Sequence, residues 1–253
     1  MNPDLPKLYG ELAGWFHLLT APEDYAEEAG IYTQAILSSS DRPPETLLEL
    51  GCGGGNNASH MKTSFMLTLT DISPQMLSLS QSLNPECEHI LGDMRSLRLG
   101  RTFDAVFVHD AVCYLTSRED LRLMLETAWI HCRPGGVALF APDFLRETFK
   151  PGTSHGGHDG EDRALRYLEW TWDPDPADDT YVSEMVYLLR DDKSTVRAVS
   201  DHHLLGLFSR SVWFDTMRAV GFVPTALPFV HSDVEPGTTE ILIGKKSPET
   251  RES

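Results

Sequence analysis

The sequence has no apolar run approaching the roughly 20 residues that an apolar helix needs to cross a bilayer. It also has no internal repeat and no low-complexity tract, and its apolar content is that of an ordinary globular protein. Residues 1–6 include neither the basic stretch nor the apolar segment of a secretory signal. We therefore expect a protein that folds as one unit in the cytoplasm and makes no contact with membranes.

Basic residues are scarce: 21 lysines and arginines stand against 38 acidic residues, which gives a formal net charge of −17. A surface of that charge repels a phosphate backbone, and no basic cluster is dense enough to reverse the effect locally. Nucleic acid is therefore excluded as a partner. The four cysteines lie far apart and show no CxxC spacing, so we expect four free thiols in a reducing compartment.

Strand and helix patterns alternate along the first part of the chain. Residues 5–37 have apolar positions at helical intervals and predict two short helices broken near Pro22. Five short apolar runs follow, separated by helical or glycine-containing segments, and these predict strands at 46–50, 66–70, 89–91, 103–108 and 137–141. Because parallel strands need crossover connections, this alternation predicts an α/β fold with a mostly parallel sheet and helices on both faces.

The pattern changes after residue 166. Segments 167–172, 181–190 and 195–205 are rich in β-forming residues and are separated by turn sequences. They predict three antiparallel strands inserted into the α/β domain. A helix that begins after Ser209 and ends at Gly221, followed by a strand at 239–244, returns the chain to the main sheet.

Four glycines stand where the first buried strand meets a helix, in the run Gly51-Cys52-Gly53-Gly54-Gly55. Glycine lets the backbone approach a ligand closely, and a helix amino terminus supplies unpaired N–H groups. Asp71 and Asp93 are expected at the carboxyl ends of the next two strands, where ligands bind in doubly wound sheets. Each aspartate alone could equally cap a helix or close a turn, but their joint order and spacing favour a nucleoside site with Asp71 on the ribose.

A dinucleotide-dependent oxidoreductase would use the same region of such a sheet. Its fingerprint is GxGxxG, and Asn56 stands at the place of the third glycine. The substitution weakens the anchoring of a pyrophosphate at this turn and favours a ligand without phosphates.

Five motifs occur in order: Glu49-Leu50-Gly51-Cys52-Gly53-Gly54-Gly55, Asp71-Ile72-Ser73-Pro74-Gln75-Met76, Gly92-Asp93-Met94, Phe103-Asp104-Ala105-Val106 and Arg133-Pro134-Gly135-Gly136. Together they resemble the class I S-adenosylmethionine-dependent methyltransferases. The resemblance implies a Rossmann-like sheet of seven strands, the last antiparallel, with S-adenosyl-L-methionine as cofactor. It also implies that Asp71 holds the ribose, that Ile72, Met76, Asp93 and Met94 surround the adenine, and that Gly51 and Gly53 line the methionine portion. Glu49 is also expected among the cofactor-binding residues.

The second half is similar to bacterial N-methyltransferases of amino sugars through Ser200-Asp201-His202-His203-Leu204-Leu205-Gly206-Leu207-Phe208, and near the start through Asp24-Tyr25-Ala26-Glu27-Glu28-Ala29. This likeness implies that N-terminal helices cover the cofactor and bring Tyr9 and Tyr25 near its methionine end. The expected parts are an N-terminal helical cap (1–40), a cofactor-binding core (41–145), an antiparallel insertion that roofs the acceptor site (146–207), the rest of the core (208–246) and a disordered tail (247–253).

The expected function is methyl transfer to nitrogen or oxygen of a small-molecule acceptor, such as an amino sugar or another natural-product intermediate. A non-catalytic module that retains the cofactor fold is the alternative from another class. The insertion also offers a sheet edge on which a homodimer could form.

His109 and Asp110 follow the fourth strand and are candidates for a catalytic base, since a base that keeps an amine or phenol deprotonated assists transfer. His109 is also expected beside the cofactor. His202 and His203 are adjacent in an extended segment, so only one, taken as His203, can face the substrate. Each histidine could instead be a hydrogen-bonded core or loop residue.

The segment 155–159 combines two histidines and an aspartate with flanking glycines. Such side chains can bind a metal, but the glycines make a rigid site unfavourable. We expect a mobile polar loop here and no metal site.

Overall fold

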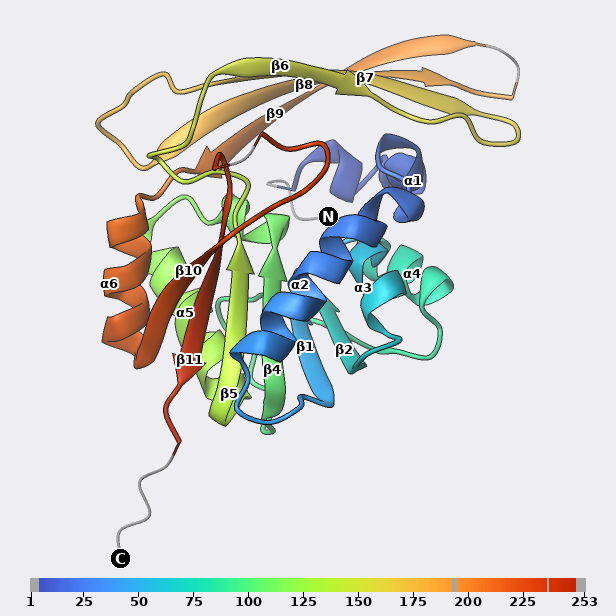
Figure 1. Ribbon diagram of the computed structural model, residues 1–253. Coiled ribbons are helices and arrows are strands. Elements are labelled where there is room, and N and C mark those ends of the chain that lie inside the picture. The colour runs from blue at the N-terminus through green and yellow to red at the C-terminus, as the bar shows by residue number, and fades with distance from the viewer. Residues whose placement is uncertain (1–4, 193–194, 236, 249–253) are drawn as a thin grey trace, which may run out of the picture.

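The computed structural model describes residues 5–192, 195–235 and 237–248. A seven-stranded sheet has the order β10-β11-β5-β4-β1-β2-β3, and a second sheet of four strands has the order β6-β7-β8-β9. The small sheet lies across one end of the large one like a roof (Figure 1). The predicted class is confirmed: a mostly parallel sheet with helices on both faces, an N-terminal helical cap and an inserted antiparallel sheet.

The parallel part of the large sheet consists of β1 (Thr46–Leu50), β2 (Met66–Asp71), β3 (Glu88–Leu91), β4 (Phe103–His109) and β5 (Cys132–Ala141). β11 (Glu240–Lys246) pairs antiparallel with both β5 and β10 (Phe222–Pro228). The carboxyl ends of the parallel strands all point toward the small sheet (Figure 1). Residues that follow these strands therefore meet beneath the roof.

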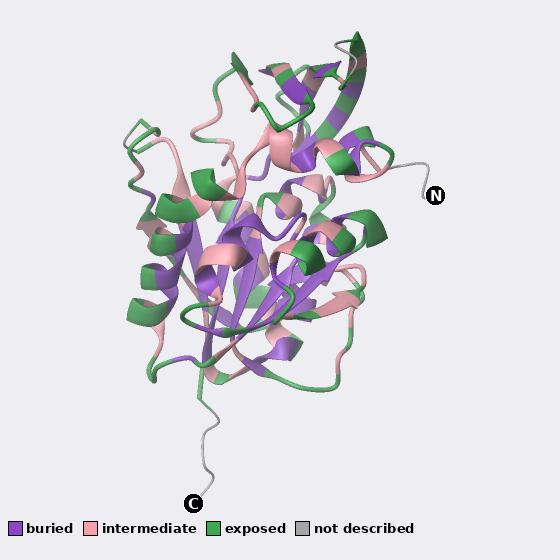
Figure 2. Cartoon of the chain, turned by 90° about the vertical axis from the view of Figure 1, so that its right-hand side faces the viewer, coloured by how far each residue is buried: buried purple, intermediate pink, exposed green. Residues whose placement is uncertain are grey.

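Different helices cover the two faces of the large sheet. Alternate strand residues such as Leu47 and Leu48 enter different apolar clusters, as the two-residue period of a strand requires. The cluster with Leu47 includes residues of α2 (Ala26–Ser39), α3 (Asn56–Met61) and α4 (Pro74–Leu83), and the cluster with Leu48 includes residues of α5 (Arg118–His131) and α6 (Arg210–Val220). Figure 2 shows the buried strands between helices whose outer faces are exposed.

The N-terminal cap differs from the predicted pair of helices. Only the second, α2, is a regular helix, and it begins after Pro22 as expected. The segment before it is a series of short turns, η1 (Lys7–Tyr9), η2 (Ala13–Trp15), α1 (Phe16–Leu19) and η3 (Pro22–Tyr25), interrupted by glycines that weaken a continuous helix. Packing replaces local helix stability here: Leu8, Leu12 and Phe16 are buried against Leu165, Tyr187 and Leu189 of the roof.

The insertion has four strands where three were predicted: β6 (Gly152–Gly156), β7 (Ala164–Trp172), β8 (Thr180–Arg190) and β9 (Val196–Gly206). The prediction of a mobile loop at 155–159 is therefore wrong, because β6 pairs with β7 through Gly156 and an isolated bridge joins Asp159 to Ala164. Glycine and small polar residues carry little β signal of their own, and the neighbouring strand decides the conformation.

Two of the sequence motifs stabilise the end of the sheet opposite the roof. Asp104 accepts hydrogen bonds from the backbone N–H groups of Glu45 and Thr46, each at 2.8 Å, and its other oxygen lies 2.8 Å from Arg133 Nε. Burial alone would raise the pKa of Asp104, but these partners hold it below its usual range. The Phe103-Asp104 and Arg133-Pro134 motifs thus join β1, β4 and β5 structurally.

Some boundaries differ from the predictions by a few residues. Cys132 already belongs to β5, so the strand begins before the Pro134-Gly135-Gly136 turn predicted to start it at Val137. Of the predicted tail, residues 249–253 lie outside the described part of the chain.

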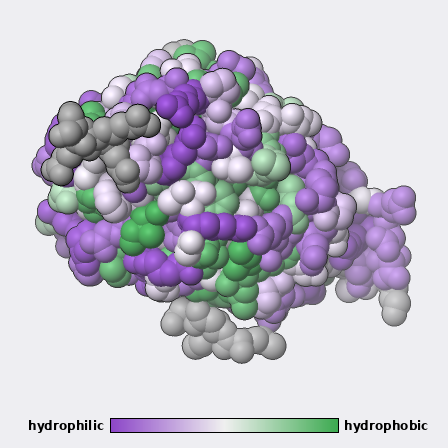
Figure 3. Space-filling model, turned by 90° about the horizontal axis from the view of Figure 1, so that it is seen from below, coloured by the Kyte–Doolittle hydropathy of each residue, from purple (hydrophilic) through white to green (hydrophobic). Residues whose placement is uncertain are grey.

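In the described part of the chain, no helix has the length and apolar character needed to cross a membrane. The end opposite the roof shows hydrophilic and hydrophobic residues interspersed (Figure 3).

Two leucines test this assignment of the core. Leu139 is fully buried in β5, whereas Leu91 in β3 is 59% exposed. We predict that Leu139→Ala lowers the free energy of unfolding by about 2–5 kcal/mol through lost burial and a residual cavity. Leu91→Ala should change it by about 0.5 kcal/mol or less. Urea unfolding of both variants measures the difference, and equal losses would contradict the described core.

Candidate functional site

A cavity of about 660 Å³ lies where the carboxyl ends of β1, β2 and β4 meet the N-terminal cap and β9. Its volume is in the range of small-molecule sites. Twelve of the thirteen residues predicted from sequence line it: Tyr9, Tyr25, Glu49, Gly51, Gly53, Asp71, Ile72, Asp93, Met94, His109, Asp110 and His203.

Met76 is the exception. It is fully buried and packs with Leu8, Leu12 and Phe16 of the cap. Its backbone N–H donates to the Ser73 side chain that caps α4, so it is not free to bind a ligand. Met76 therefore packs against the cap and does not line the cavity.

The glycine turn after β1 exposes backbone without side chains at the cavity wall. Gly51 has φ +79°, and a Cβ at this position would lie 2.3 Å from the Cβ of Ala111. Gly53 has φ +52° and donates its N–H to Asp71 Oδ2 at 2.8 Å. Both conformations favour glycine strongly, so the turn predicted from the sequence is a structural requirement of the site.

Asp71 ends β2 and is 8% exposed. Besides Gly53, the backbone N–H of Ser73 donates to its Oδ1 at 2.8 Å. Burial raises the pKa of Asp71, while these backbone hydrogen bonds oppose the increase. Each carboxylate oxygen still has a lone pair, so the side chain is fixed in position and can accept hydrogen bonds from two neighbouring hydroxyls.

Glu49 lies on β1 with 3% of its surface exposed, and its Oε2 has no hydrogen-bond partner. Burial raises the pKa of Glu49 to about 8, with Asp71 and Glu28 adding to the effect and His109 opposing it. At neutral pH the side chain is therefore mainly protonated. A cationic ligand placed beside it would restore its charge.

Asp93 lines the cavity, but Arg95 occupies much of its carboxylate. Arg95 donates from its backbone N–H and its guanidinium, with the shortest contact 2.7 Å to Asp93 Oδ2, and also reaches Asp120 at 3.0 Å. Burial would raise the pKa of Asp93, yet Arg95 holds it below its ordinary value. Asp93 is thus a fixed negative charge at the cavity edge, with Met94 beside it.

The cap closes the cavity with two tyrosines. Ser73 Oγ donates to the backbone oxygen of Tyr9 at 2.6 Å, which ties the cap to the turn after β2. Tyr25 Oη accepts from Thr20 Oγ1 at 3.1 Å, and its ring stands edge-on to that of His109. Burial raises the pKa of both tyrosine hydroxyls, which therefore keep their protons.

His109 ends β4 and lies among acidic side chains. Its Nε2 is 2.9 Å from Asp110 Oδ1 and 3.6 Å from Glu28 Oε1, and its Nδ1 is 3.2 Å from Asn57 Nδ2. Burial lowers the pKa of His109, but the carboxylates, Asp110 above all, outweigh it and raise the pKa to about 10. His109 therefore keeps its proton at neutral pH, and the structure does not favour it as a base.

His203 is 5% exposed on the inner face of β9, whereas His202 points outward and pairs with Glu184 at 2.6 Å. His203 Nδ1 lies 2.8 Å from Tyr114 Oη, which in turn donates to Tyr9 Oη at 3.2 Å. Its Nε2 is 3.5 Å from Asp201 Oδ2 and makes no hydrogen bond. Burial raises the pKa of Tyr114 well above its ordinary value, so its hydroxyl keeps its proton near neutral pH.

Four buried polar atoms that line the cavity have no hydrogen-bond partner: Glu49 Oε2, Asn56 Oδ1, Asn57 Oδ1 and His203 Nε2. An unsatisfied buried group costs about 1–3 kcal/mol. Their convergence on one cavity fits a polar ligand that satisfies them. A nucleoside with an attached amino acid has the hydroxyls, ammonium and carboxylate that such a wall can bind, so the residues present fit S-adenosylmethionine.

The sequence pattern did not predict several residues that line the cavity or support its walls. Glu28 and Asn57 come from α2 and α3, and they meet only because the two helices pack together; Asn57 Nδ2 donates to Glu28 Oε1 at 2.9 Å. Asp143 follows β5 and hydrogen-bonds Asp110. His158 Nε2 lies 3.0 Å from Asp24 Oδ2, but among the described residues no group of three His, Cys, Asp or Glu side chains is arranged to hold a metal ion.

The comparisons with known proteins agree with this geometry. A family model described as a methyltransferase domain matches residues 47–136. The dTDP-3-amino-3,4,6-trideoxy-alpha-D-glucopyranose N,N-dimethyltransferase of Streptomyces venezuelae is 30% identical over 203 residues, 79% of this chain and 84% of that protein. The dTDP-3-amino-3,6-dideoxy-alpha-D-glucopyranose N,N-dimethyltransferase of Streptomyces fradiae is 31% identical over 147 residues, 56% and 57% of the two chains.

Solved structures have the same fold over nearly the whole chain. Streptomyces venezuelae DesVI matches with a TM-score of 0.79 and 26% identity, covering 95% of this chain and 98% of its own. The sugar N-methyltransferase KedS8 from Streptoalloteichus sp ATCC 53650 matches with a TM-score of 0.81 and 23% identity, covering 98% and 96%. CalS10 from Micromonospora echinaspora, solved with S-adenosylmethionine bound, has a TM-score of 0.75 at 23% identity and covers 94% and 96%. The chain therefore belongs to the S-adenosylmethionine-dependent methyltransferases, and its cofactor is S-adenosyl-L-methionine.

Proposed function

We propose that the protein methylates an amino group of an amino sugar. The observation that carries this proposal is the relative that acts on a 3-amino sugar, of which this chain covers 84% at 30% identity. The acceptor side of the cavity supports it, because Asp110 and the other carboxylates around it attract an ammonium group. An amine needs only to lose its proton to become a nucleophile toward an electrophilic methyl group.

Each donor-site residue has a role that follows from its position. With the cofactor bound, Asp71 would accept hydrogen bonds from both ribose hydroxyls, while Ile72, Asp93 and Met94 would surround the adenine. Gly51 and Gly53 would let the methionine portion approach the backbone, and Glu49 would face its ammonium. When bound, the cofactor supplies a methyl group that its sulfonium makes electrophilic, and Tyr9 and Tyr25 exclude water from it.

On the acceptor side, we assign the role of base to His203. Because Tyr114 donates its single proton to Tyr9, the contact with His203 requires Nδ1–H of the imidazole to donate to Tyr114. In neutral His203 the unpartnered Nε2 then has a free lone pair for the proton of the acceptor ammonium. His109 and Asp110 form a fixed ion pair that positions the amine.

A homodimer is a further proposal, supported by the outer face of the roof. Six exposed apolar side chains lie on it: Leu168, Trp170, Val186, Leu188, Val196 and Leu204. The charged residues of this face are already paired within the chain: Arg166 and Arg190 with Asp159, and Glu184 with His202. A twofold pairing of two copies would cover the apolar side chains.

We also infer that the protein acts in the cytoplasm without binding nucleic acid. All four cysteines are free thiols, which a reducing compartment maintains. The net charge of −17 opposes association with a phosphate backbone.

The proposed activity has a direct assay. Incubation with S-adenosylmethionine and a 3-amino-3,6-dideoxy sugar should yield S-adenosylhomocysteine and products heavier by one or two methyl groups, seen by mass spectrometry. The matched sugar with a hydroxyl at carbon 3 should yield neither. Methylation of the hydroxyl sugar alone would contradict an amine acceptor.

The two histidines should respond differently to substitution. Without its base, His203→Ala should lower kcat about 10²-fold or more at pH 7 and lose less at high pH, where the amine is already deprotonated. His109→Gln keeps a hydrogen bond to Asp110 but not the charge, so its loss should be similar at every pH between 6.5 and 9. pH–rate profiles distinguish these outcomes. If only the activity of His109→Gln recovers at high pH, His109 and not His203 is the base.

The proposed dimer can be tested in solution. Leu188→Glu places a charge within the apolar outer face, where the desolvation of that charge opposes pairing. Sedimentation velocity should show a dimer for the wild-type protein and a monomer for this variant. Val223→Glu, at another exposed apolar position, on the large sheet, is the control and should remain dimeric. A monomeric wild-type protein at micromolar concentration would remove the proposal.

A further inference from the structure

Asp201 is a buried carboxylate that has no part in the roles assigned above. It lies on β9 two residues before His203, so both side chains point to the inner face of the roof. Asp201 is 6% exposed and His203 is 5% exposed, whereas His202 and Leu204, the alternate residues of the strand, are exposed. Burying a charge is costly unless its partners compensate for it, so the partners of Asp201 indicate its role.

The N-terminal cap supplies one partner. The backbone N–H of Lys7, the first residue of η1, donates to Asp201 Oδ2 at 2.8 Å. The ammonium group of Lys7 donates to the backbone oxygen of Ser200 at 2.7 Å. These contacts fix the cap to β9 and orient the carboxylate. A neutral amide could accept the Lys7 N–H without the cost of a buried charge, so this contact alone does not account for an aspartate.

His203 is the second partner. Its Nε2 lies 3.5 Å from Asp201 Oδ2, but it makes no hydrogen bond. The tautomer explains the mismatch, because Nδ1–H of His203 donates to Tyr114 and leaves a lone pair on Nε2 of the neutral ring. Nε2 and Oδ2 are then two acceptors that face each other. A proton placed on Nε2 would convert the mismatch into a charge-assisted contact.

Other ionisable groups around this pair are neutral or paired elsewhere. Three tyrosines come from the cap, the turn after β4 and the roof: Tyr9, Tyr114 and Tyr187. Burial raises the pKa of all three hydroxyls, which therefore keep their protons. Across the cavity, Asp110 pairs with His109. Burial also raises the pKa of Asp143 well above its usual range, so this carboxyl is protonated.

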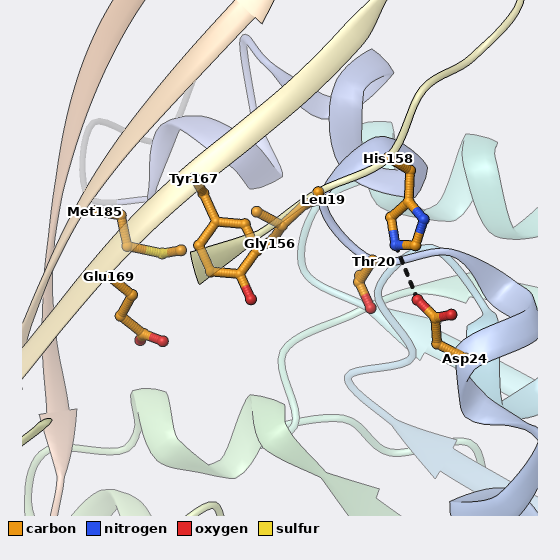
Figure 4. A pocket seen from close by; sticks show the side chains of 9 residues that line it. Leu19, Thr20, Asp24, Gly156, His158, Tyr167, Glu169 and Met185 are labelled. Atoms are coloured by element: carbon orange, nitrogen blue, oxygen red, sulfur yellow. Dashed lines mark ion pairs between the residues drawn. The ribbon is translucent and has the colours of Figure 1, made fainter. Parts of the chain in front are cut away.

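Glu169 is another carboxylate on the inner face of the roof, but it is held away from His203. Its side chain points from β7 into a separate cavity between the roof and the cap (Figure 4). Ser183 Oγ donates to its Oε1 at 2.7 Å, and Ser154 Oγ donates to its Oε2 at 2.9 Å. Within the described part of the chain, Asp201 is the carboxylate at ion-pair distance from His203.

The turn that holds Asp201 also belongs to the donor site. Tyr9, the last residue of η1, lines the donor cavity, and its backbone oxygen accepts from Ser73 Oγ at 2.6 Å. The backbone N–H of Ser73 in turn donates to Asp71. Lys7, two residues before Tyr9, binds Asp201. One short turn therefore contacts both the ribose side of the donor site and the acidic partner of His203.

We propose that Asp201 is a positioning residue for methyl transfer: it stabilises the imidazolium that His203 forms when its Nε2 takes the proton of the acceptor ammonium. This rests on the proposed amine methylation with His203 as base. In the step, an N–H bond of the ammonium breaks and an Nε2–H bond forms beside Asp201. The nitrogen lone pair released in this way bonds to the methyl carbon as the bond from that carbon to sulfur breaks. The proton passes to solvent when the product leaves.

Asp201→Asn tests the proposal, with dTDP-3-amino-3,6-dideoxyglucose as acceptor and saturating S-adenosylmethionine. The amide can still accept the Lys7 N–H but has no charge, so His203 takes the proton less readily. At pH 7, kcat should fall about tenfold, and the acid limb of the pH–rate profile should move about one pH unit lower, with KM unchanged. The loss should disappear above about pH 9, where the amine is deprotonated without a base.

Glu184→Gln is the matched control, because it makes the same change beside the neighbouring histidine. Glu184 stands opposite His202 and pairs with it at 2.6 Å on the outer face of the roof. Its pH–rate profile should match that of the wild type. Asp201→Ser, which is smaller and also uncharged, should move the acid limb in the same direction, so the test does not depend on the folding of the amide variant.

A loss of kcat that is equal at every pH, or a raised KM with the acid limb in place, would overturn the proposal, because Asp201 would then only fix the cap. Calorimetry should show an unchanged affinity of Asp201→Asn for S-adenosylhomocysteine, which confirms that the cap and the donor site are intact. If the wild-type protein binds S-adenosylhomocysteine but does not methylate the amino sugar, the proposed function itself fails.

Discussion

The site depends on one buried carboxylate held by backbone. Asp71 is fixed at the end of β2 by N–H groups of Gly53 and Ser73, one from the glycine turn after β1 and one from the turn into α4. A charged group in this position needs such partners because burial alone disfavours its charge. The glycine at position 53 is needed for the same reason, since its φ of +52° aims the N–H at Asp71. The two turns and the carboxylate thus form one rigid unit on which a ribose can be recognised.

Around this unit, the molecule is built so that the cavity exists only when three parts meet. The core supplies the glycine turn and the acidic residues, the cap supplies Tyr9 and Tyr25, and the roof supplies His203. Apolar contacts of Leu8, Leu12 and Phe16 with the roof keep these parts together. The two histidines have different electrostatic surroundings. Asp110 raises the pKa of His109 and keeps it protonated, whereas His203 has a buried nitrogen without a hydrogen-bond partner. Two histidines that look alike in sequence therefore have different chemistry.

Much of the donor side could be predicted from sequence because its signals are local. A buried strand followed by glycines, and an aspartate at the end of the next strand, determine both conformation and position, and the α/β order of the sheet follows from the alternation of patterns. The acceptor side could not be predicted in this way. Glu28, Asn57 and Asp143 reach the site through helix packing and strand order, and β6 forms from glycine and small polar residues only because β7 lies beside it. The protonation of His109 likewise depends on carboxylates distant in sequence, such as Glu28 and Asp143.

The most direct test of this account is the affinity of the purified protein for S-adenosylhomocysteine, measured by calorimetry for the wild type and for Asp71→Asn. The amide preserves shape but loses the charged acceptor, and one of its two positions presents a donor to the backbone N–H groups. We predict micromolar binding by the wild type and a loss of at least about tenfold in the variant, the worth of one hydrogen bond to a charged group. Equal affinities, or a wild-type protein that does not bind the ligand, would contradict the central claim.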